Sequence, residues 1–306
     1  MTTPVWKLFE IPEVAAEYAD VFLTEADQTL IRAMGQQPFS PTQAKAVLGD
    51  QAEAYLASAY RRGIINLEDE AERIYRVNNF YGMLDVFAIT QAETYRALPQ
   101  TVRSALDDWY FAEYCAGLDR SDRPTADEVL PMAEVLRFIE AQTRPVYLNY
   151  CDCRSLRGDC GLPKQTCITY KSAPNTFAHR GLSERISKER AKEIVRAADR
   201  AGLMHTVNPN GICNCCGYCC YLFRAQRARN SGGVWPKTER IIALDPARCI
   251  SCGRCTRRCH FEALAREGGF IRLYPERCVG CGICAEACPG GALRLVERKK
   301  GKEEIL

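Results

Sequence analysis

Cysteine side chains are the residues of this sequence with the most distinctive chemistry. The chain of 306 residues contains 18 cysteines, and eight of them form two copies of one spacing. In each copy three cysteines stand at intervals of three residues, and a fourth follows four residues later: Cys249, Cys252, Cys255 and Cys259, then Cys278, Cys281, Cys284 and Cys288. Thiolates at this spacing bind 4Fe-4S clusters. The second copy lies 29 residues after the first (278 minus 249), which indicates an internal repeat.

The fourth cysteine of each copy is expected to point away from the other three and to bind the other cluster. One ligand set is therefore Cys249, Cys252, Cys255 and Cys288, and the other is Cys278, Cys281, Cys284 and Cys259. Gly253 and Gly282 lie inside the two loops, where a missing side chain lets the backbone approach a cluster. Zinc is the competing metal, but its sites close with four ligands from two short hooks, and the doubled pattern does not favour it.

These residues resemble bacterial two-cluster ferredoxins over about residues 237–298. The resemblance implies a small α+β domain that holds both clusters. One position departs from the pattern, because His260 stands where proline usually follows the fourth cysteine, as Pro289 does in the second copy. We interpret His260 as a tolerated turn residue; the alternative is a hydrogen-bond donor or protonatable group beside a cluster.

A second group of nine cysteines occupies residues 151–220. They divide by sequence into a set of four and a dense group of five: Cys151, Cys153, Cys160 and Cys167, then Cys213, Cys215, Cys216, Cys219 and Cys220. Packing does not explain this density, so we expect these residues to bind metal. Two further cubane clusters, one further cluster of cubane or irregular type, and zinc all suit soft thiolate ligands.

Regular elements are expected to hold this second group in place. Residues 145–150 read as a buried strand that leads directly to Cys151, and residues 187–201 read as a helix capped by Ser187 and ended by Gly202. His205 follows as a candidate for a catalytic proton donor or cluster ligand; alternatively it ends the helix favourably. Arg154 is expected to hold an anionic group, or to be a structural or solvated arginine.

The first third of the chain predicts three helices and a two-stranded ribbon, which is the order of a winged helix. Helices are expected over residues 24–34, 41–49 and 50–62, with Thr24, Ser40 and Asp50 as their caps, and strands near 64–65 and 73–77. Residues 1–100 hold 8 Lys and Arg against 14 Asp and Glu, whereas a phosphate-binding surface is basic. A structural or protein-docking role is therefore favoured over nucleic-acid binding. A further helical stretch is predicted from Phe87 to Cys115, with Cys115 as a buried apolar residue.

Charge and the remaining composition place further limits. Residues 151–260 hold 20 Lys and Arg against 8 Asp and Glu, so basic charge surrounds the cysteines and could compensate the anionic clusters or bind an acidic redox partner. The N-terminus lacks a signal-peptide pattern, no apolar run is long enough to insert in a membrane, and no Walker or dinucleotide motif is present. We expect a cytoplasmic protein that receives its electrons from a protein partner. The sequence does not indicate an oligomeric state.

From about Trp6 to its end the chain resembles cytoplasmic multi-cluster iron-sulfur proteins of anaerobic prokaryotes. The resemblance rests on four motifs, in addition to the winged-helix-like start and the two-cluster ferredoxin end: Glu128-Val129-Leu130-Pro131, Cys151-Asp152-Cys153-Arg154, Gly202-Leu203-Met204-His205 and the cysteines from Cys213 to Cys220. It implies multi-cluster electron transfer and does not assign a substrate.

The sequence thus predicts an α+β protein of three parts and a charged tail. These are a winged-helix-like domain (1–98), a cysteine-rich iron-sulfur middle domain (99–236), a two-cluster 4Fe-4S ferredoxin domain (237–298) and the tail (299–306). The expected function is the relay of single low-potential electrons between a redox partner and a second cluster site in the middle domain. Two alternatives are an iron-sulfur reductase that binds a substrate at an unusual middle cluster, and an iron-sulfur transcription regulator.

Overall fold

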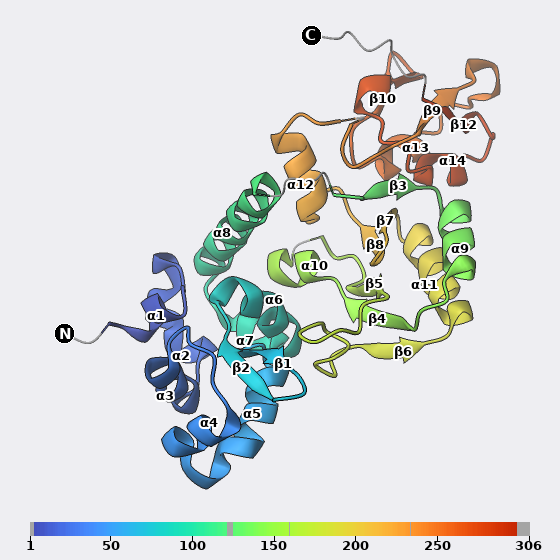
Figure 1. Cartoon of the computed structure of the whole chain (residues 1–306). Helices are drawn as coiled ribbons and strands as arrows, with labels where there is room; N and C mark the ends of the chain where they lie inside the picture. The colour runs from blue at the N-terminus through green and yellow to red at the C-terminus, as the bar shows by residue number, and fades with distance from the viewer. Residues whose placement is uncertain (1–2, 121–124, 159, 233, 299–306) are drawn as a thin grey trace, which may run out of the picture. The chain divides into compact units, whose positions relative to one another are not determined.

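The computed structural model describes residues 3–120, 125–158, 160–232 and 234–298, which form a mixed α+β structure (Figure 1). The chain divides into two compact units. The first comprises the described residues of 1–121, 149–158 and 171–184, and the second those of 122–148, 159–170 and 185–306. The boundaries expected after residues 98 and 236 differ from this division, because the cysteine-rich middle stretch contributes to both units. The expected tail, 299–306, lies outside the described residues.

The first unit begins with helices, two of which start where the sequence predicts. The opening elements are α1 (Val5–Leu8), a 3-10 helix (Glu13–Tyr18), α2 (Ala19–Phe22), α3 (Glu25–Met34) and α4 (Pro41–Leu48). At the start of α3 the Thr24 hydroxyl accepts a hydrogen bond from the Asp27 N–H, and the Asp27 carboxylate accepts one from the Thr24 N–H. Ser40 and Gln43 form the same capping box on α4. Both predicted caps are confirmed, since each satisfies N–H groups that the first helical turn leaves unpaired.

The predicted cap of the third helix is wrong. Helix α5 (Ala52–Arg61) follows a 3-10 turn (Gly49–Gln51), and its N-terminal residue is preceded by Gln51, which makes no side-chain cap. Asp50 lies inside the 3-10 turn, where its carboxylate is 3.2 Å from the Lys45 ammonium group. The tighter turn moves the helix start past the position that Asp50 could cap.

A two-stranded ribbon follows the three helices. Strands β1 (Ile65–Asp69) and β2 (Ile74–Val77) pair antiparallel, with Ile65 opposite Val77, and Phe39 forms an isolated bridge to Tyr75 of β2. The order of helices and strands is the one that the sequence predicts for this region. The end of the ribbon where Ile65 is opposite Val77 faces the core, since both side chains are buried.

Three helices stand where one helical stretch was predicted from Phe87 to Cys115: α6 (Phe80–Thr90), α7 (Ala92–Ala97) and α8 (Gln100–Asp119). Phe22 contacts Phe80 and Phe87 edge-to-face in the core that α6 covers. Cys115 is half-buried on α8, so the expectation of a fully buried residue is wrong. Helix α10 (Asp152–Arg157) contacts α6 and α8 in the same unit. Among the described helices, none is long and apolar enough to cross a membrane.

A buried ion pair ties α3 to the end of α5. The Asp27 carboxylate is fully buried and accepts two hydrogen bonds of 2.7 Å from the Arg62 guanidinium and one of 2.8 Å from the Tyr55 hydroxyl. Burial alone would raise the pKa of Asp27, but the hydrogen bonds and charge of Arg62 outweigh it and lower that pKa. A lowered carboxyl pKa contributes stability above its ordinary value of 3.8, and this contribution is lost as the pH falls through the folded pKa.

Replacing Arg62 with methionine is expected to lower the free energy of unfolding by about 2–3 kcal/mol at neutral pH, because it leaves Asp27 buried without its cation. Urea unfolding at several pH values measures the effect, and the variant should lose less stability than the wild type on acidification. The control Asp50→Asn removes an exposed pair and should not change stability. Equal loss in Arg62→Met and Asp50→Asn would contradict a stabilising role for the buried pair.

The second unit is built on a six-stranded sheet with the order β3-β7-β8-β5-β4-β6. Its strands are β3 (Glu128–Leu130), β4 (Val146–Tyr150), β5 (Gln165–Thr169), β6 (Glu184–Ile186), β7 (Met204–Asn208) and β8 (Gly211–Cys215). Helices α9 (Met132–Ala141) and α11 (Lys188–Arg200) contact each other along one side of this sheet (Figure 1). Val135, Val195 and Ile212 are among the buried residues of their common core. Strand β4 and helix α11, with Ser187 as its cap, lie as predicted.

The last part of the second unit repeats one order of elements. Helix α12 (Tyr221–Ala228) leads into it. The first copy contains β9 (Arg240–Leu244), a 3-10 turn (Pro246–Arg248), α13 (Arg254–Arg258) and β10 (Leu264–Glu267); the second contains β11 (Phe270–Leu273), a 3-10 turn (Pro275–Arg277), α14 (Ile283–Glu286) and β12 (Leu293–Glu297). β9 pairs with β12 and β10 with β11, all antiparallel. The predicted repeat is therefore present in the structure as well as in the cysteine spacing.

Candidate iron-sulfur and thiolate sites

Each predicted ligand set of the C-terminal part lines one small cavity. Cys249, Cys252, Cys255 and Cys288 line the first, and Cys259, Cys278, Cys281 and Cys284 line the second. In both cavities the fourth cysteine comes from the other copy of the repeat: α13 and α14 contact each other, and Cys259 and Cys288 follow just after these helices. The structure thus brings together the two sets that the spacing predicts as ligands.

The walls of these cavities suit a cluster held by thiolates. Leu244 and Leu293 line the first and Ile242 and Leu264 the second, so both are largely apolar. Backbone N–H groups also approach the sulfur atoms: Gly280 donates to Cys278 Sγ at 3.4 Å, Ala263 to Cys259 Sγ at 3.4 Å and Ala292 to Cys288 Sγ at 3.3 Å. Amide donors to sulfur and low polarity are the means by which a protein adjusts cluster potentials.

Burial opposes ionisation of these thiols in the protein alone. It raises the pKa of Cys281 to about 12, and burial is also the largest cause of the raised pKa of Cys278 and Cys284. Thiolates bind metals, so metal binding at such a site must displace protons that burial favours. The donor set therefore fits a group whose own positive metal ions replace those protons.

Glycine is required at the second loop for a steric reason. Gly280 has a φ of 67°, and a Cβ atom there would lie 2.1 Å from the Arg240 carbonyl oxygen of β9. The Thr238 hydroxyl lies between the two segments: it donates to the Val279 carbonyl oxygen at 2.8 Å and is 3.1 Å from the Arg240 carbonyl oxygen. The close contact holds the Cys278–Cys281 loop against β9.

Replacing Gly280 with alanine is expected to lower the free energy of unfolding by about 3 kcal/mol and to reduce iron retention, because backbone atoms must move to admit the methyl group. Thermal unfolding and iron content measure the two effects. Gly268→Ala is the matched control: Gly268 also has a positive φ, of 56°, but has open space where the Cβ would lie. Its expected cost is about 1 kcal/mol with no loss of iron. Equal effects of the two substitutions would exclude the steric explanation.

The comparison with known proteins agrees with this geometry. Residues 271–294, which include all four cysteines of the second copy, match the 4Fe-4S binding domain. No curated protein matches the chain. The match defines an iron-sulfur protein that binds a 4Fe-4S cluster and indicates electron transfer as its general function. The first copy and the nine middle cysteines lie outside the matched segment.

Three of the middle cysteines form one compact group in the second unit. Cys160, Cys216 and Cys219 have sulfur atoms within 4.8 Å of one another. The Cys219 N–H donates to Cys216 Sγ at 3.1 Å, and Leu203 packs against the group. Cys160 thus joins the cysteines of the turn after β8. Cys151 and Cys153 belong to the first unit and Cys160 and Cys167 to the second, so the expected set of Cys151, Cys153, Cys160 and Cys167 stays a prediction.

A second sulfur group lies on β8 and its neighbours. Cys215 Sγ is 3.4 Å from Cys220 Sγ, and the pKa of Cys215 is raised well above its ordinary value by hydrogen bonds with Cys213 and Cys220 and by burial. β5 pairs antiparallel with β8 so that Ile168 is opposite Ile212, and this register places Cys167 beside Cys213. The neighbour of Cys167 is therefore set by a long-range strand pairing.

Cys151 and Cys153 form a third group, with Asp152, in the first unit. Their ligand atoms lie within 4.8 Å of one another, at the end of β4 and the start of α10. Arg154 follows on α10 and has only 1 % of its surface exposed, so the alternative of a solvated arginine is wrong. With each unit taken by itself, the printed contacts thus define one group of middle cysteines in the first unit and two in the second.

His205 is placed differently from the expectation that it ends a helix. It lies within β7, opposite Asn214 of β8, and is fully buried. Its Nδ1 is 2.5 Å from Asn214 Oδ1, and its Nε2 is 3.6 Å from a carboxylate oxygen of Asp199. A substrate in solvent cannot reach this imidazole, so the position argues against His205 as a direct proton donor.

His260 is a packing residue between the two cysteine-rich parts of the second unit. Its Nε2 lies 2.7 Å from the Gly202 carbonyl oxygen, and a Cβ atom on Gly217 would lie 2.4 Å from the His260 Cβ. Gly217 stands between Cys216 and Cys219, and His260 follows Cys259. The turn that carries the middle thiols is thus in contact with the ferredoxin-type part, a relation that no sequence signal indicated.

Proposed function

We propose that the chain relays single low-potential electrons between a protein partner and a metal-thiolate site in its middle part, through two C-terminal 4Fe-4S clusters. The proposed ligands are the two cysteine sets that line the two cavities. When bound, the clusters supply one-electron chemistry, while the protein supplies distance, burial and hydrogen bonds.

One observation carries this proposal. Cys281, of the second ligand set, packs against the same hydrophobic cluster as Cys215 and Cys220 of the middle part. Val279 and Ile283, which flank Cys281, are buried in that cluster. Packing of both thiol groups against one apolar core supports electron transfer between them.

The middle site is proposed to hold one or two further iron-sulfur clusters. One observation favours a second candidate, a single ion on Cys160, Cys216 and Cys219. Zinc bound to thiolates at about 2.3 Å in a tetrahedron places sulfur atoms about 3.8 Å apart, which is compatible with their grouping within 4.8 Å. A zinc site would serve structure and would remove the middle part from the electron path.

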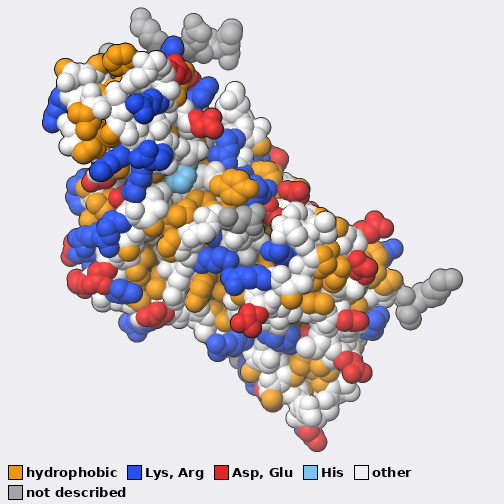
Figure 2. Space-filling model, turned by 180° about the vertical axis from the view of Figure 1, so that it is seen from behind, with side chains coloured by type: hydrophobic (Ala, Val, Ile, Leu, Met, Phe, Trp, Pro, Cys, Tyr) orange, Lys and Arg blue, Asp and Glu red, His pale blue; other side chains and the backbone are white. Residues whose placement is uncertain are grey.

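The partner is proposed to bind at the first ligand set. Cys252 is exposed there, and the neighbouring Ile250 has 67 % of its surface exposed. The side chains of Arg248, Arg254 and Arg257 are exposed on the same loop and helix. On the face seen in Figure 2, Lys and Arg side chains gather beside hydrophobic ones over the upper part. An apolar residue with cationic neighbours suits an acidic redox protein.

The N-terminal unit is proposed to be a winged-helix-like domain that binds a protein partner. Glu53 on α5 pairs with Arg73, and Arg62 at the end of α5 pairs with Asp27. These ion pairs leave few cationic side chains there to bind the phosphates of a nucleic acid. Reduced thiols and oxygen-sensitive clusters suit the cytoplasm of an anaerobic cell, which is the setting that we propose.

Electron delivery from a reduced acidic ferredoxin tests the proposed docking surface. In stopped-flow mixing at low salt, Arg254→Gln/Arg257→Gln is expected to slow reduction about tenfold, and the wild-type rate should fall steeply with ionic strength. Arg190→Gln, on α11, is the control. Reduction by a neutral photochemical flavin reductant should be equal in all three proteins. Salt-independent and equal rates with the ferredoxin would contradict the docking surface.

A further inference from the structure

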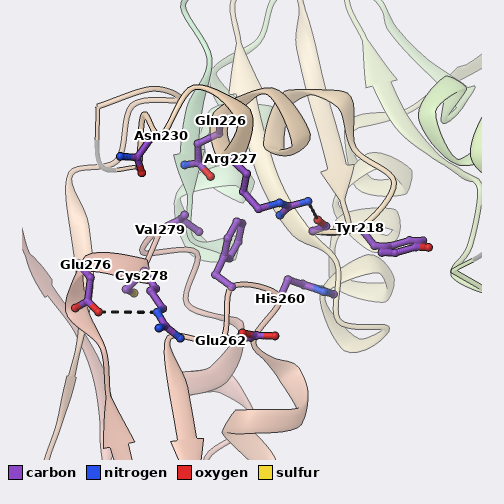
Figure 3. Close-up of a pocket in the computed structure, with 13 residues that line it drawn as sticks. Tyr218, Gln226, Arg227, Asn230, His260, Glu262, Glu276, Cys278 and Val279 are labelled. Carbon is purple, nitrogen blue, oxygen red and sulfur yellow. Dashed lines mark hydrogen bonds and ion pairs between the residues drawn. The ribbon is translucent and has the colours of Figure 1, made fainter. Parts of the chain in front are cut away.

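A pocket of about 530 Å³ lies between the middle thiol turn, α12 and the loops of the ferredoxin-type part. Its wall includes Tyr218, which stands between Cys216 and Cys219, and Cys278 of the second ligand set (Figure 3). The volume is in the range that accepts a small organic molecule. A molecule in this pocket would therefore touch both cysteine-rich parts of the second unit.

One polar group in the wall points to a ligand. Gln226 of α12 is buried, with 2 % of its surface exposed, and its Nε2 has no hydrogen-bond partner among the residues that the structure describes. Figure 3 shows its amide facing the space above Val279. A buried donor without a partner costs about 1–3 kcal/mol of free energy, and a ligand with a hydrogen-bond acceptor in the pocket would recover it.

The remaining lining gives the chemistry of that acceptor. Arg227 and Arg277 line the same pocket, and each guanidinium carries more N–H donors than its protein contacts use: Arg227 donates to the Gly217 carbonyl, and Arg277 lies 3.9 Å from Glu276. Asn230 and Glu262, also in the wall, both hold positive φ angles, of 50° and 54°. Such backbone conformations in non-glycine residues gather at binding sites.

We propose that this pocket binds a small organic carboxylate, with the Gln226 amide and the two guanidiniums as donors to its oxygens. The carboxylate would then lie against Cys278 and the thiol turn, at the place where the proposed relay could pass electrons to a small molecule. The role of the carboxylate as an electron acceptor rests on the proposed relay. Binding of the carboxylate depends only on the residues that line the pocket.

Isothermal titration of the anaerobically purified, cluster-loaded protein tests the binding. The probes are acetate, pyruvate, succinate, L-malate and L-glutamate, each compared with its neutral amide. At least one carboxylate is expected to bind more tightly than its amide. Gln226→Met keeps the shape of the side chain and removes the donor, and should weaken that binding about tenfold. Gln226→Glu should weaken it further, since it places a second carboxylate against the ligand.

Gln37→Met is the matched control, because Gln37 is exposed in the first unit and does not line the pocket. It should bind as the wild type does. Iron content and the melting temperature of each variant separate loss of binding from loss of folding. Binding of none of the carboxylates, or equal affinity in Gln226→Met and the wild type, would overturn the proposal. If a carboxylate binds although the middle part contains no iron, the proposed binding pocket stands and the proposed electron relay is contradicted.

Discussion

Replacing Cys288 with alanine is expected to remove the cluster of the first copy, although Cys288 lies in the second. Cys288 lines the cavity formed by Cys249, Cys252 and Cys255. About four iron atoms should be lost in each of the single variants Cys288→Ala, Cys252→Ala and Cys281→Ala, since each removes one ligand of one cubane. Iron and sulfide analysis of anaerobically purified protein gives the counts.

Double variants distinguish this crossover from ligation within each copy. Cys252→Ala with Cys288→Ala should lose about four irons, no more than either single variant, because both belong to one cluster. Cys281→Ala with Cys288→Ala should lose about eight. Ligation within each copy predicts the reverse. Cys115→Ala changes a half-buried cysteine of α8 and is the control, with no iron lost.

The middle part should lose its metal in a pattern set by the spatial groups. Cys160→Ala and Cys216→Ala are each expected to release the metal bound by the group of Cys160, Cys216 and Cys219, while the about eight irons of the C-terminal part remain. The double variant should release no more than either single one. Removing one thiolate from a closed site leaves the metal with too few ligands, so near-complete loss is expected.

Cys151→Ala provides the comparison within the middle part, because the division by sequence joined Cys151 to Cys160. If the spatial group is the unit that binds metal, Cys151→Ala alone should keep the metal bound by Cys160, Cys216 and Cys219. A variant Cys160→Ala that keeps all of the metal, while Cys151→Ala loses the metal of Cys216, would contradict the spatial group.

Local spacing allowed the C-terminal part to be predicted from the sequence. The cysteines of each set lie on one short loop and one helical turn, and the repeat supplies the fourth ligand, so few long-range contacts decide the arrangement. The capping boxes of Thr24 and Ser40 are local in the same sense. Asp50 failed as a cap because a 3-10 turn, which the cap pattern does not encode, precedes α5.

The middle part could not be predicted in this way, because pairing between distant strands decides it. Cys167 lies beside Cys213 through the β5–β8 register, and Cys160 meets Cys216 across more than fifty residues of chain. His205 was expected at a helix end, but the sheet places it inside β7. No spacing rule indicated Gln226, which stands out because its buried amide nitrogen has no hydrogen-bond partner among the described residues.

Metal and sulfide analysis with Mössbauer spectroscopy on anaerobically prepared protein tests the central claim most directly. Two C-terminal cubanes account for about eight irons with equal sulfide, and the relay requires further iron in the middle part, up to about sixteen for two more cubanes. The proposed relay predicts iron above eight, with no stoichiometric zinc. About eight irons together with one zinc per chain would contradict it, since zinc on the middle thiolates cannot accept electrons.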